Sequence, residues 1–292
     1  MSISESDWRV AVVMITHNRC EEVLRSLEHL TCLPEQPSIL VVDNGSADGT
    51  ATAITRRFPQ VAVLDAGSNR GAAGRTLGVR HVEAPYVAFC DDDTWWEPGS
   101  LERAADLFDA HARLGVLTAR VLLGPGARED PACVEMERSP LPAEPEMPGR
   151  PLLGFLAGAS VVRRSAFLEA GGFPENAFIG GEEQVLAVDL ATRGWWLCYV
   201  PELVVHHYPS PRRDLFARRS HLMRNALWFA WLRRPLGSAL RRTFRAACAL
   251  PWDAAVRHGF FAALAGLPGV LHQRRVVPPE VERSLRLLES RR

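Results

Sequence analysis

Three adjacent aspartates, Asp91-Asp92-Asp93, directly follow an apolar run, YVAFC. Carboxylates this close repel one another unless a cation or several hydrogen-bond donors compensate them. Oxygen ligands of this kind suit Mg²⁺ or Mn²⁺ carrying a diphosphate. The aspartates could instead cap a helix expected over 99–112, near the positive end of its dipole. Pro98 and Ser100 can begin that helix without them, so the sequence favours a metal site.

Two more polar segments could face a nucleotide. Asp43-Asn44-Gly45-Ser46 ends the run ILVV, and its carboxylate could accept hydrogen bonds from a base or a ribose. An ordinary Asn-Gly turn is the alternative. Residues 69–75 (NRGAAGR) form a small-residue turn that opens a helix. Such a turn lets backbone N–H groups and arginines approach a phosphate, although a plain tight turn explains it nearly as well.

An acid pair, Glu182-Glu183, opens an expected helix after two glycines. The helix dipole alone stabilises acids in a first turn, whereas the functional alternative is a general base close to a reaction centre. His206-His207 closes an expected strand over 196–205. Imidazole could complete a carboxylate metal site, or the pair could be only a polar strand end.

A parallel sheet would bring these clusters together. Apolar runs that alternate with amphipathic helices predict a mostly parallel sheet covered on both faces. Right-handed crossovers then place the carboxyl ends of the strands at one edge, where such sheets bind ligands. The strands are expected at 10–15, 39–42, 61–64 and 86–90, and the helices at 20–30, 48–58, 73–83 and 99–112.

The rest of the chain changes character twice. Residues 124–151 are rich in proline and predict a mobile loop. A strand over 152–162, a short helix over 164–170 and a helix over 182–193 follow, and arginine-rich helices broken at prolines 235, 251 and 268 come after residue 212. We therefore expect a catalytic domain over 1–211, made of a nucleotide-binding half (1–123) and an acceptor-side half (152–211), and a helical basic region over 212–292.

The 292 residues are 47% hydrophobic and 23% charged, which excludes a disordered or collagen-like protein. Six scattered cysteines with no CxxC pair argue against a zinc site. The net charge is zero and every basic residue is arginine, but residues 1–211 hold 17 arginines against 29 acids and residues 212–292 hold 17 against 5. This asymmetry indicates an anionic partner for the basic region.

The start of the chain lacks the plan of a signal peptide. The longest apolar stretches, 151–162 and 259–271, are each about a dozen residues, short of the roughly 20 of a membrane-spanning helix. The sequence predicts a cytoplasmic protein. Residues 215–234 mix arginines with Leu, Trp and Phe, which fits a helix on an anionic lipid surface at the inner face of the membrane, a homodimer interface, or a helix packed on the core. A nucleic-acid partner is not expected, because no nucleic-acid module is recognised.

Taken in order, these segments resemble the family 2 glycosyltransferases, which are inverting enzymes with the GT-A fold. The resemblance covers about residues 10–210, and it also extends to the branch of rhamnosyl- and galactofuranosyltransferases. It implies an α/β fold, a Rossmann-like mostly parallel sheet flanked by helices, followed here by an arginine-rich helical extension. The matching segments are VVMITHNR, LVVDNGSADGT, NRGAAGRTLGV, YVAFCDDDT, GASVVRRSAFLEAGGFPE, GGEEQVLAVDLATRGW and VPELVVHHYPS.

The resemblance implies metal-dependent transfer of a sugar from a nucleoside-diphosphate sugar to an acceptor hydroxyl on a glycan, a lipid-linked glycan or a natural product. Mn²⁺ or Mg²⁺ would be the cofactor. The family's catalytic acid pair corresponds to Glu182 and Glu183, and Glu183 would be the catalytic base. The family often has Asp where Glu183 stands. Family members often carry Asn where Thr76 stands, so no nucleotide role passes to Thr76.

The family's donor residues map onto this chain as well. Asp93 would bind the metal with Asp91, assisted by His206 or, failing that, His207. The residues that would line the nucleotide and its diphosphate are Thr16, Asn18, Arg19, Asp43, Arg70, Asp91 and Asp92.

Five residues are candidates for the substrate pocket, and His207 is one of them. Trp95 and Trp96 could stack on a sugar ring or pack against the sheet. Arg212 and Arg213 follow the histidine pair closely and could face the donor diphosphate from inside the protein.

Two other functions compete with glycosyl transfer. A nucleotidyltransferase that makes nucleoside-diphosphate sugars shares the core and the metal, but it usually has a glycine-rich N-terminal loop that MITHNRCEE lacks. A catalytically silent scaffold of the same fold would not need to keep the acids at 91–93 and 182–183.

Overall fold

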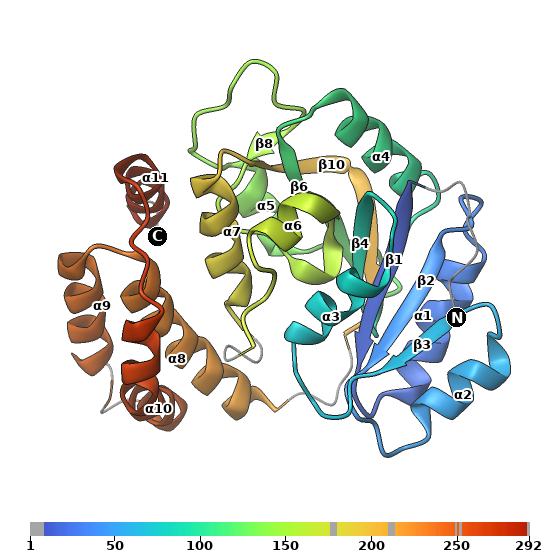
Figure 1. Cartoon of the computed structure of the whole chain (residues 1–292), viewed down its shortest axis with the longest axis horizontal. Helices are drawn as coiled ribbons and strands as arrows, with labels where there is room; N and C mark the ends of the chain where they lie inside the picture. Colours follow the sequence, from blue (N-terminus) through green and yellow to red (C-terminus); the bar gives the residue numbers. More distant parts are fainter. Residues whose placement is uncertain (1–8, 176–179, 210–213, 249, 251–252, 291–292) are drawn as a thin grey trace.

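The structure is a computed structural model that describes residues 9–175, 180–209, 214–248, 250 and 253–290. Arg212 and Arg213 lie outside the described residues. Within that part, a ten-stranded sheet forms the centre of the molecule and helices cover both of its faces (Figure 1). The strands are β1 (Val10–Thr16), β2 (Ser38–Asp43), β3 (Ala62–Asp65), β4 (Tyr86–Asp91), β5 (Thr94–Trp96), β6 (Leu114–Leu123), β7 (Arg128–Glu129), β8 (Arg150–Pro151), β9 (Ser160–Arg163) and β10 (Trp196–His207).

The sheet is mixed but mostly parallel, as the sequence predicts. Its order is β3-β2-β1-β4-β9-β6-β10-β5, with β7 beside β6 and β8 beside β10. Strands β1 to β4 run parallel, and β9 runs antiparallel between β4 and β6. Thr16 pairs with Asp43 of β2, and Ile15 pairs with Asp91 of β4. The carboxyl ends of β1, β2 and β4 therefore lie together at one edge of the sheet.

The alternation of β1 explains why helices cover both faces. Val12 and Met14 join one core cluster, which contains residues of α1 and α4, whereas Val13 and Ile15 join the other, which contains residues of α3, α6 and α7. A strand buried on both faces must be apolar at every position. The helices that precede β10 in the chain are α1 (Cys20–Thr31), α2 (Thr50–Arg57), α3 (Ala73–His81), α4 (Ser100–Ala110), α5 (Pro131–Glu137), the 3₁₀ helix η1 (Ala157–Ala159), α6 (Arg164–Glu169) and α7 (Glu182–Thr192).

Three parts of the sequence prediction need correction. Strand β6 lies in the middle of the sheet but was not predicted, although its run is apolar except at two positions. The segment 124–151, expected to be a loop, contains α5 and the short strands β7 and β8. The strand expected over 152–162 shrinks to β9, because the Ala159 N–H and the Ser160 hydroxyl both donate to the Leu156 carbonyl and turn the chain.

The first and the last of the four C-terminal helices pack against α7 (Figure 1). They are α8 (Leu215–Arg233), α9 (Leu236–Cys248), α10 (Ala254–His272) and α11 (Pro279–Glu289). Val185 and Val188 of α7 share an apolar cluster with Phe229 and Leu232 of α8. Arg233 of α8 adds a two-pronged ion pair with Asp189 of α7, at 2.6 and 2.8 Å. The basic extension is therefore joined to the helix that carries the acid pair.

Helix α10 differs from expectation in length. It continues through Pro268, where a break was predicted. Because of this continuation, α10 is long and apolar enough to cross a membrane when judged by length and composition alone, whereas the sequence offered only stretches of about a dozen residues. In the structure, 28% of its most apolar window is buried.

Candidate active site

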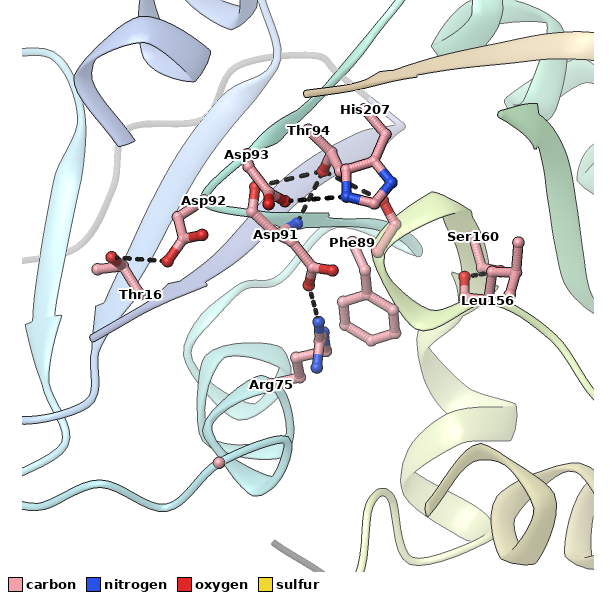
Figure 2. A network of polar contacts seen from close by, with 12 residues as sticks. Thr16, Arg75, Phe89, Asp91, Asp92, Asp93, Thr94, Leu156, Ser160 and His207 are labelled. Atoms are coloured by element: carbon pink, nitrogen blue, oxygen red, sulfur yellow. Dashed lines mark hydrogen bonds and ion pairs between the residues drawn. The ribbon is translucent and has the colours of Figure 1, made fainter. Parts of the chain in front are cut away.

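The three adjacent aspartates point in three directions from the end of β4 (Figure 2). Asp91 accepts a hydrogen bond from Arg75. The Asp92 carboxylate accepts from the Thr16 hydroxyl at 3.2 Å, and the Asp93 carboxylate lies 3.4 Å from Nε2 of His207. Each acid therefore has a different polar partner, which relieves the repulsion expected of adjacent carboxylates.

A local turn produces this divergence. Strand β4 ends at Asp91 and β5 begins at Thr94. The Asp91 N–H donates to the Thr94 hydroxyl oxygen at 2.8 Å, and that hydroxyl lies 3.3 Å from the Gly158 carbonyl oxygen. The aspartates do not cap α4, because that helix begins after Gly99, whose N–H donates to Glu35 at 2.6 Å. The capping interpretation of the aspartates is therefore wrong.

Arg19 is the cation beside the second and third aspartates. Its guanidinium lies 3.8 Å from the Asp92 carboxylate and 3.9 Å from the Asp93 carboxylate. Burial raises the pKa of Asp92 to about 8, against the opposing effect of Arg19. Asp93 is also buried. Burial therefore favours the protonated, neutral form of Asp92, and the positive charge of Arg19 offsets negative charge on Asp92 and Asp93.

Arg75 lies at the centre of the site and received no role of its own from the sequence. It projects from α3, is only 3% exposed, and forms an ion pair with Asp91. Burial raises the pKa values of Glu182 and Glu183, and the positive charge of Arg75 opposes this rise. The sequence places Arg75 at the end of the small-residue turn 69–75, but only its burial in the structure distinguishes it from the other arginines.

The acid pair begins α7 as predicted. Gly180 and Gly181 have φ angles of 91° and 93°, a left-handed conformation that favours glycine, and they lead directly into the helix. Asn225 of α8 donates to the Gly180 carbonyl at 2.6 Å and so ties this turn down. The elements that fix the acid pair therefore include the C-terminal extension.

Burial controls the charge of the acid pair. It raises the pKa values of both carboxyls, and the like charge of Glu183 raises that of Glu182 further. Glu182 is 2% exposed, and its Oε2 has no hydrogen-bond partner among the residues that the structure describes. An acid of this kind takes up a proton more readily than an ordinary glutamate.

The two histidines separate on alternate faces of β10. His207 faces Asp93, whereas His206 lies 3.6 Å from Glu97 and stacks against the ring of Trp95 at 5.8 Å. The sequence prediction placed His206 beside the metal-binding aspartate and kept His207 in reserve. The structure brings His207 rather than His206 to Asp93, because alternate residues of a strand point to opposite faces.

The two tryptophans belong to the core. Trp96 is fully buried, and its indole N–H donates to the Phe89 carbonyl at 3.2 Å. Trp95 is 7% exposed, stacks on His29 at 4.1 Å and contacts the ring of Tyr208 at 4.7 Å. Of the two roles considered for these residues, packing is the one that the structure supports, and the sugar-stacking role is corrected.

The loops after β1 and β2 are joined by hydrogen bonds. Asn18, which has a φ of 52°, accepts from the Ala47 N–H at 2.7 Å, and its own N–H donates to Ser46 at 2.9 Å. The Asp43 carboxylate accepts from the Ser46 N–H at 2.9 Å. Together with Thr16, these residues build one continuous rim. Arg70 lies on the neighbouring loop after β3, where its Nε–H donates to the Ala66 carbonyl at 3.2 Å and its guanidinium is 3.9 Å from Glu175.

The comparison with known families decides the identity of this arrangement. Residues 11–171, which run from the second residue of β1 to beyond β9, match the model of glycosyl transferase family 2. The chain belongs to this family. It is therefore a glycosyltransferase enzyme, and the nucleotidyltransferase and scaffold alternatives are set aside.

Similar sequences support the rhamnosyltransferase-like branch. The chain is 32% identical over 232 residues to the N-acetylglucosaminyl-diphospho-decaprenol L-rhamnosyltransferase of Mycobacterium tuberculosis, covering 68% of this chain and 76% of that protein. It is also 31% identical over 101 residues to the uncharacterized glycosyltransferase YwdF of Bacillus subtilis, covering 33% and 37%.

Solved structures share the fold of this glycosyltransferase. The mannosyltransferase PcManGT of Pyrobaculum calidifontis, solved with GDP-Man and Mn²⁺, superposes with a TM-score of 0.56 at 17% identity over 97% of this chain and 86% of that one. TarS of S. aureus, residues 1–349 with UDP-GlcNAc, gives 0.61 at 16% identity over 95% and 84%.

Gly158 leaves room for Asp91, and this allows a test of the site in the glycosyltransferase. A Cβ at position 158 would lie 2.5 Å from Oδ2 of Asp91, so the Gly158→Ala variant must displace that carboxylate. We expect kcat/KM to fall by about 10²-fold, as misplacement by about 1 Å can cause, while the melting temperature stays close to wild type. Gly154→Ala is the matched control, because its Cβ meets no described atom within 4 Å. Equal activities of the two variants would exclude a role for the position of Asp91.

Proposed function

We propose that this protein transfers a sugar from a nucleoside-diphosphate sugar to a hydroxyl of a lipid-diphosphate-linked glycan, with inversion at the anomeric carbon and with a divalent cation. The observation that carries this proposal is the position of Arg75. Its ion pair with Asp91 and its effect on the pKa values of Glu182 and Glu183 join the aspartate cluster to the acid pair. A carboxylate that can accept a proton and a cluster that can hold a diphosphate are the two parts such a reaction needs.

Glu183 is the base in this mechanism. An acceptor hydroxyl has a high pKa and needs a positioned carboxylate to take its proton during attack. The hydroxyl oxygen forms a bond to the anomeric carbon on the face opposite the nucleotide, and the bond from that carbon to the diphosphate breaks. The proton remains on Glu183, and the electron pair leaves with the diphosphate. Burial raises the pKa of Glu183 above that of an ordinary glutamate, which makes its carboxylate a stronger base.

The residues around Asp93 fit a divalent cation. Its buried carboxylate and the His207 imidazole lie side by side at 3.4 Å, which offers one oxygen and one nitrogen donor. No group of three metal-binding side chains forms among the described residues, as suits a cation that takes its other ligands from a diphosphate and water. Asp93 and His207 would hold Mn²⁺ or Mg²⁺, with Asp91 nearby. When bound, such a cation offsets negative charge on the departing diphosphate.

In this proposal, the rim and the arginines next to it bind the nucleotide and its diphosphate. The joined loops after β1 and β2 would receive the base and the ribose, and Arg19 and Arg75 would face the diphosphate. Arginine suits this task because its charge is permanent and its fork matches phosphate oxygens. The residues assigned to the nucleotide and its diphosphate are Thr16, Asn18, Arg19, Asp43, Arg70, Arg75, Asp91 and Asp92.

The acceptor proposal rests on the mycobacterial relative, whose name specifies a sugar on diphospho-decaprenol and the transfer of L-rhamnose. The same acceptor class would hold this enzyme at the inner face of the membrane, in the cytoplasm. The basic C-terminal helices suit an anionic lipid-linked substrate.

A donor panel tests the function. The purified protein is incubated with N-acetylglucosaminyl-diphospho-polyprenol, Mn²⁺ or Mg²⁺, and L-rhamnose and other sugars on uridine, guanosine and thymidine diphosphates. We expect transfer from one L-rhamnosyl donor, abolished by chelation of the cation, with inverted configuration in the NMR spectrum of the product. Transfer with retained configuration or undiminished transfer under chelation contradicts the mechanism, and failure with every donor contradicts the function.

A further inference from the structure

A groove in the C-terminal helices opens beside the acid pair. A hollow of about 360 Å³ is lined at one end by Gly181 and Gln184, the residues that flank Glu182 and Glu183, and continues along α8. A second hollow, of about 280 Å³, lies between α8 and α9. The two share Met223, Ala226 and Arg242 as lining residues, so they adjoin along α8, and together they make a groove that leads away from the proposed base.

The floor of this groove is apolar. Leu222, Met223, Ala226 and Leu227 of α8 line it in succession, and Ala246 of α9 faces them. The same α8 segment positions the acid pair, because Asn225 holds the Gly180 carbonyl. A ligand lying on this floor would therefore contact the helix that fixes the turn before Glu182.

The walls of the groove carry a surplus of positive charge. Three carboxylates pair with arginines there: Asp253 with Arg219, Glu282 with Arg234, and Glu289 with Arg234 and Arg242. The five arginines that line the groove are Arg219, Arg234, Arg241, Arg242 and Arg245. Two positive charges therefore remain after these carboxylates are counted, which balances a doubly anionic diphosphate diester.

We propose that this groove binds the prenyl diphosphate part of the acceptor. The diphosphate would meet Arg241 and Arg245, with the first prenyl units on the apolar floor and the sugar directed along the groove towards Glu183. Phe244, which is 71% exposed on α9, offers an apolar contact between this helix and a bilayer. The inference rests on the proposed function, which it extends by assigning the acceptor to the C-terminal helices.

Direct binding tests this assignment without catalysis. Calorimetry with the full-length protein uses farnesyl diphosphate as the probe, with farnesol and inorganic pyrophosphate as comparisons. We expect farnesyl diphosphate to bind at least about tenfold more tightly than either comparison, because charge and apolar contact act together. Affinity for farnesyl diphosphate no higher than for pyrophosphate or for farnesol overturns the proposal.

Two variants locate the site. Arg241→Glu/Arg245→Glu reverses two exposed charges on the wall, and Ala226→Trp fills the floor where the two hollows meet. Each is expected to weaken farnesyl diphosphate binding by about tenfold or more and to raise the KM for the lipid-linked acceptor. The matched control is Arg275→Glu/Arg283→Glu, which makes the same charge change at exposed positions outside the groove and should bind the probe like wild type.

The outcomes separate this inference from the proposed function. Unchanged binding in both groove variants overturns the inference even if the donor panel demonstrates transfer. Weakened binding in both, with the control unaffected, supports the groove even if no donor in the panel is accepted. Binding to vesicles that follows their anionic lipid content, and that farnesyl diphosphate does not compete away, assigns the surface to the membrane and also overturns the inference.

Discussion

The Glu183→Gln variant is expected to lose about 10³-fold in kcat while its affinity for the donor stays within about twofold of wild type. General-base help is typically worth about 10²–10⁴-fold, and the amide keeps the size of the side chain while it cannot take the proton. The proposed donor contacts lie on other elements, around β1, β2 and β4, so they should survive. Single-turnover kinetics with calorimetry of the nucleoside diphosphate measures both quantities. A variant that turns over like wild type would show that Glu183 is not the base.

The neighbouring acid provides the control for this prediction. Glu182→Gln also removes a buried carboxyl, whose Oε2 has no hydrogen-bond partner among the described residues, but it leaves the proposed base in place. We expect a loss of less than about tenfold from it. A larger loss from Glu182→Gln than from Glu183→Gln would reverse the two roles.

The pH dependence adds a readout that a structural role would not give. The base must be ionised, and burial raises the pKa of Glu183 above the ordinary value of about 4.3. Activity should therefore fall as pH decreases, and the fall should begin nearer neutrality than an ordinary glutamate would allow. Arg75 lowers the pKa values of both acids, so Arg75→Gln should move the fall to higher pH. A profile that stays flat down to about pH 5 would contradict this assignment.

The elements that depend on local pattern were predictable from the sequence. The first strands and helices match because each buried strand is a continuous apolar run and each helix begins at a recognisable break. Strand β6 escaped prediction although its run is nearly as apolar. Its place beside β9 and β10 depends on pairing between distant segments, which local pattern does not encode.

The residues of the site likewise divide into those that the sequence could predict and those that it could not. The acids at 91–93 and 182–183 are visible because several carboxylates in a row need a reason. The choice between His206 and His207 depends on the register of β10 against β5, and Arg75 was hidden because one arginine among many carries no signal until its burial is known. The sequence leaves the tryptophans open between the pocket and the core, and their burial in the structure favours the core.

The packing of the C-terminal extension lay beyond local pattern as well. Its charge indicated an anionic partner. The groove, however, depends on tertiary packing: α8 packs on α7, and α9 and α10 pack on α8. The division of the chain at residue 211 stays a prediction. The tie from Asn225 to Gly180 suggests that the two parts act on one site.

The second large effect concerns Asp93. The Asp93→Asn variant is expected to lose the Mn²⁺-dependent part of its donor affinity and about 10³-fold in kcat/KM, because the amide keeps the shape of the side chain but removes the charge that would hold the cation. Calorimetry of nucleoside diphosphate binding with Mn²⁺ and with a chelator measures the difference directly. In wild type, we expect chelation to weaken binding by at least about tenfold, and in the variant the two measurements should coincide.

The histidine pair decides whether this loss comes from a metal site or from general damage. His207 faces Asp93 at 3.4 Å, whereas His206 faces Glu97 and the ring of Trp95. His207→Ala should therefore raise the Mn²⁺ concentration needed for half-maximal activity by about tenfold, and His206→Ala should leave it unchanged, although both remove an imidazole from one strand. A metal dependence that shifts with His206 alone would restore the order predicted from the sequence. A Mn²⁺-dependent donor affinity that survives in Asp93→Asn would remove Asp93 from the metal site altogether.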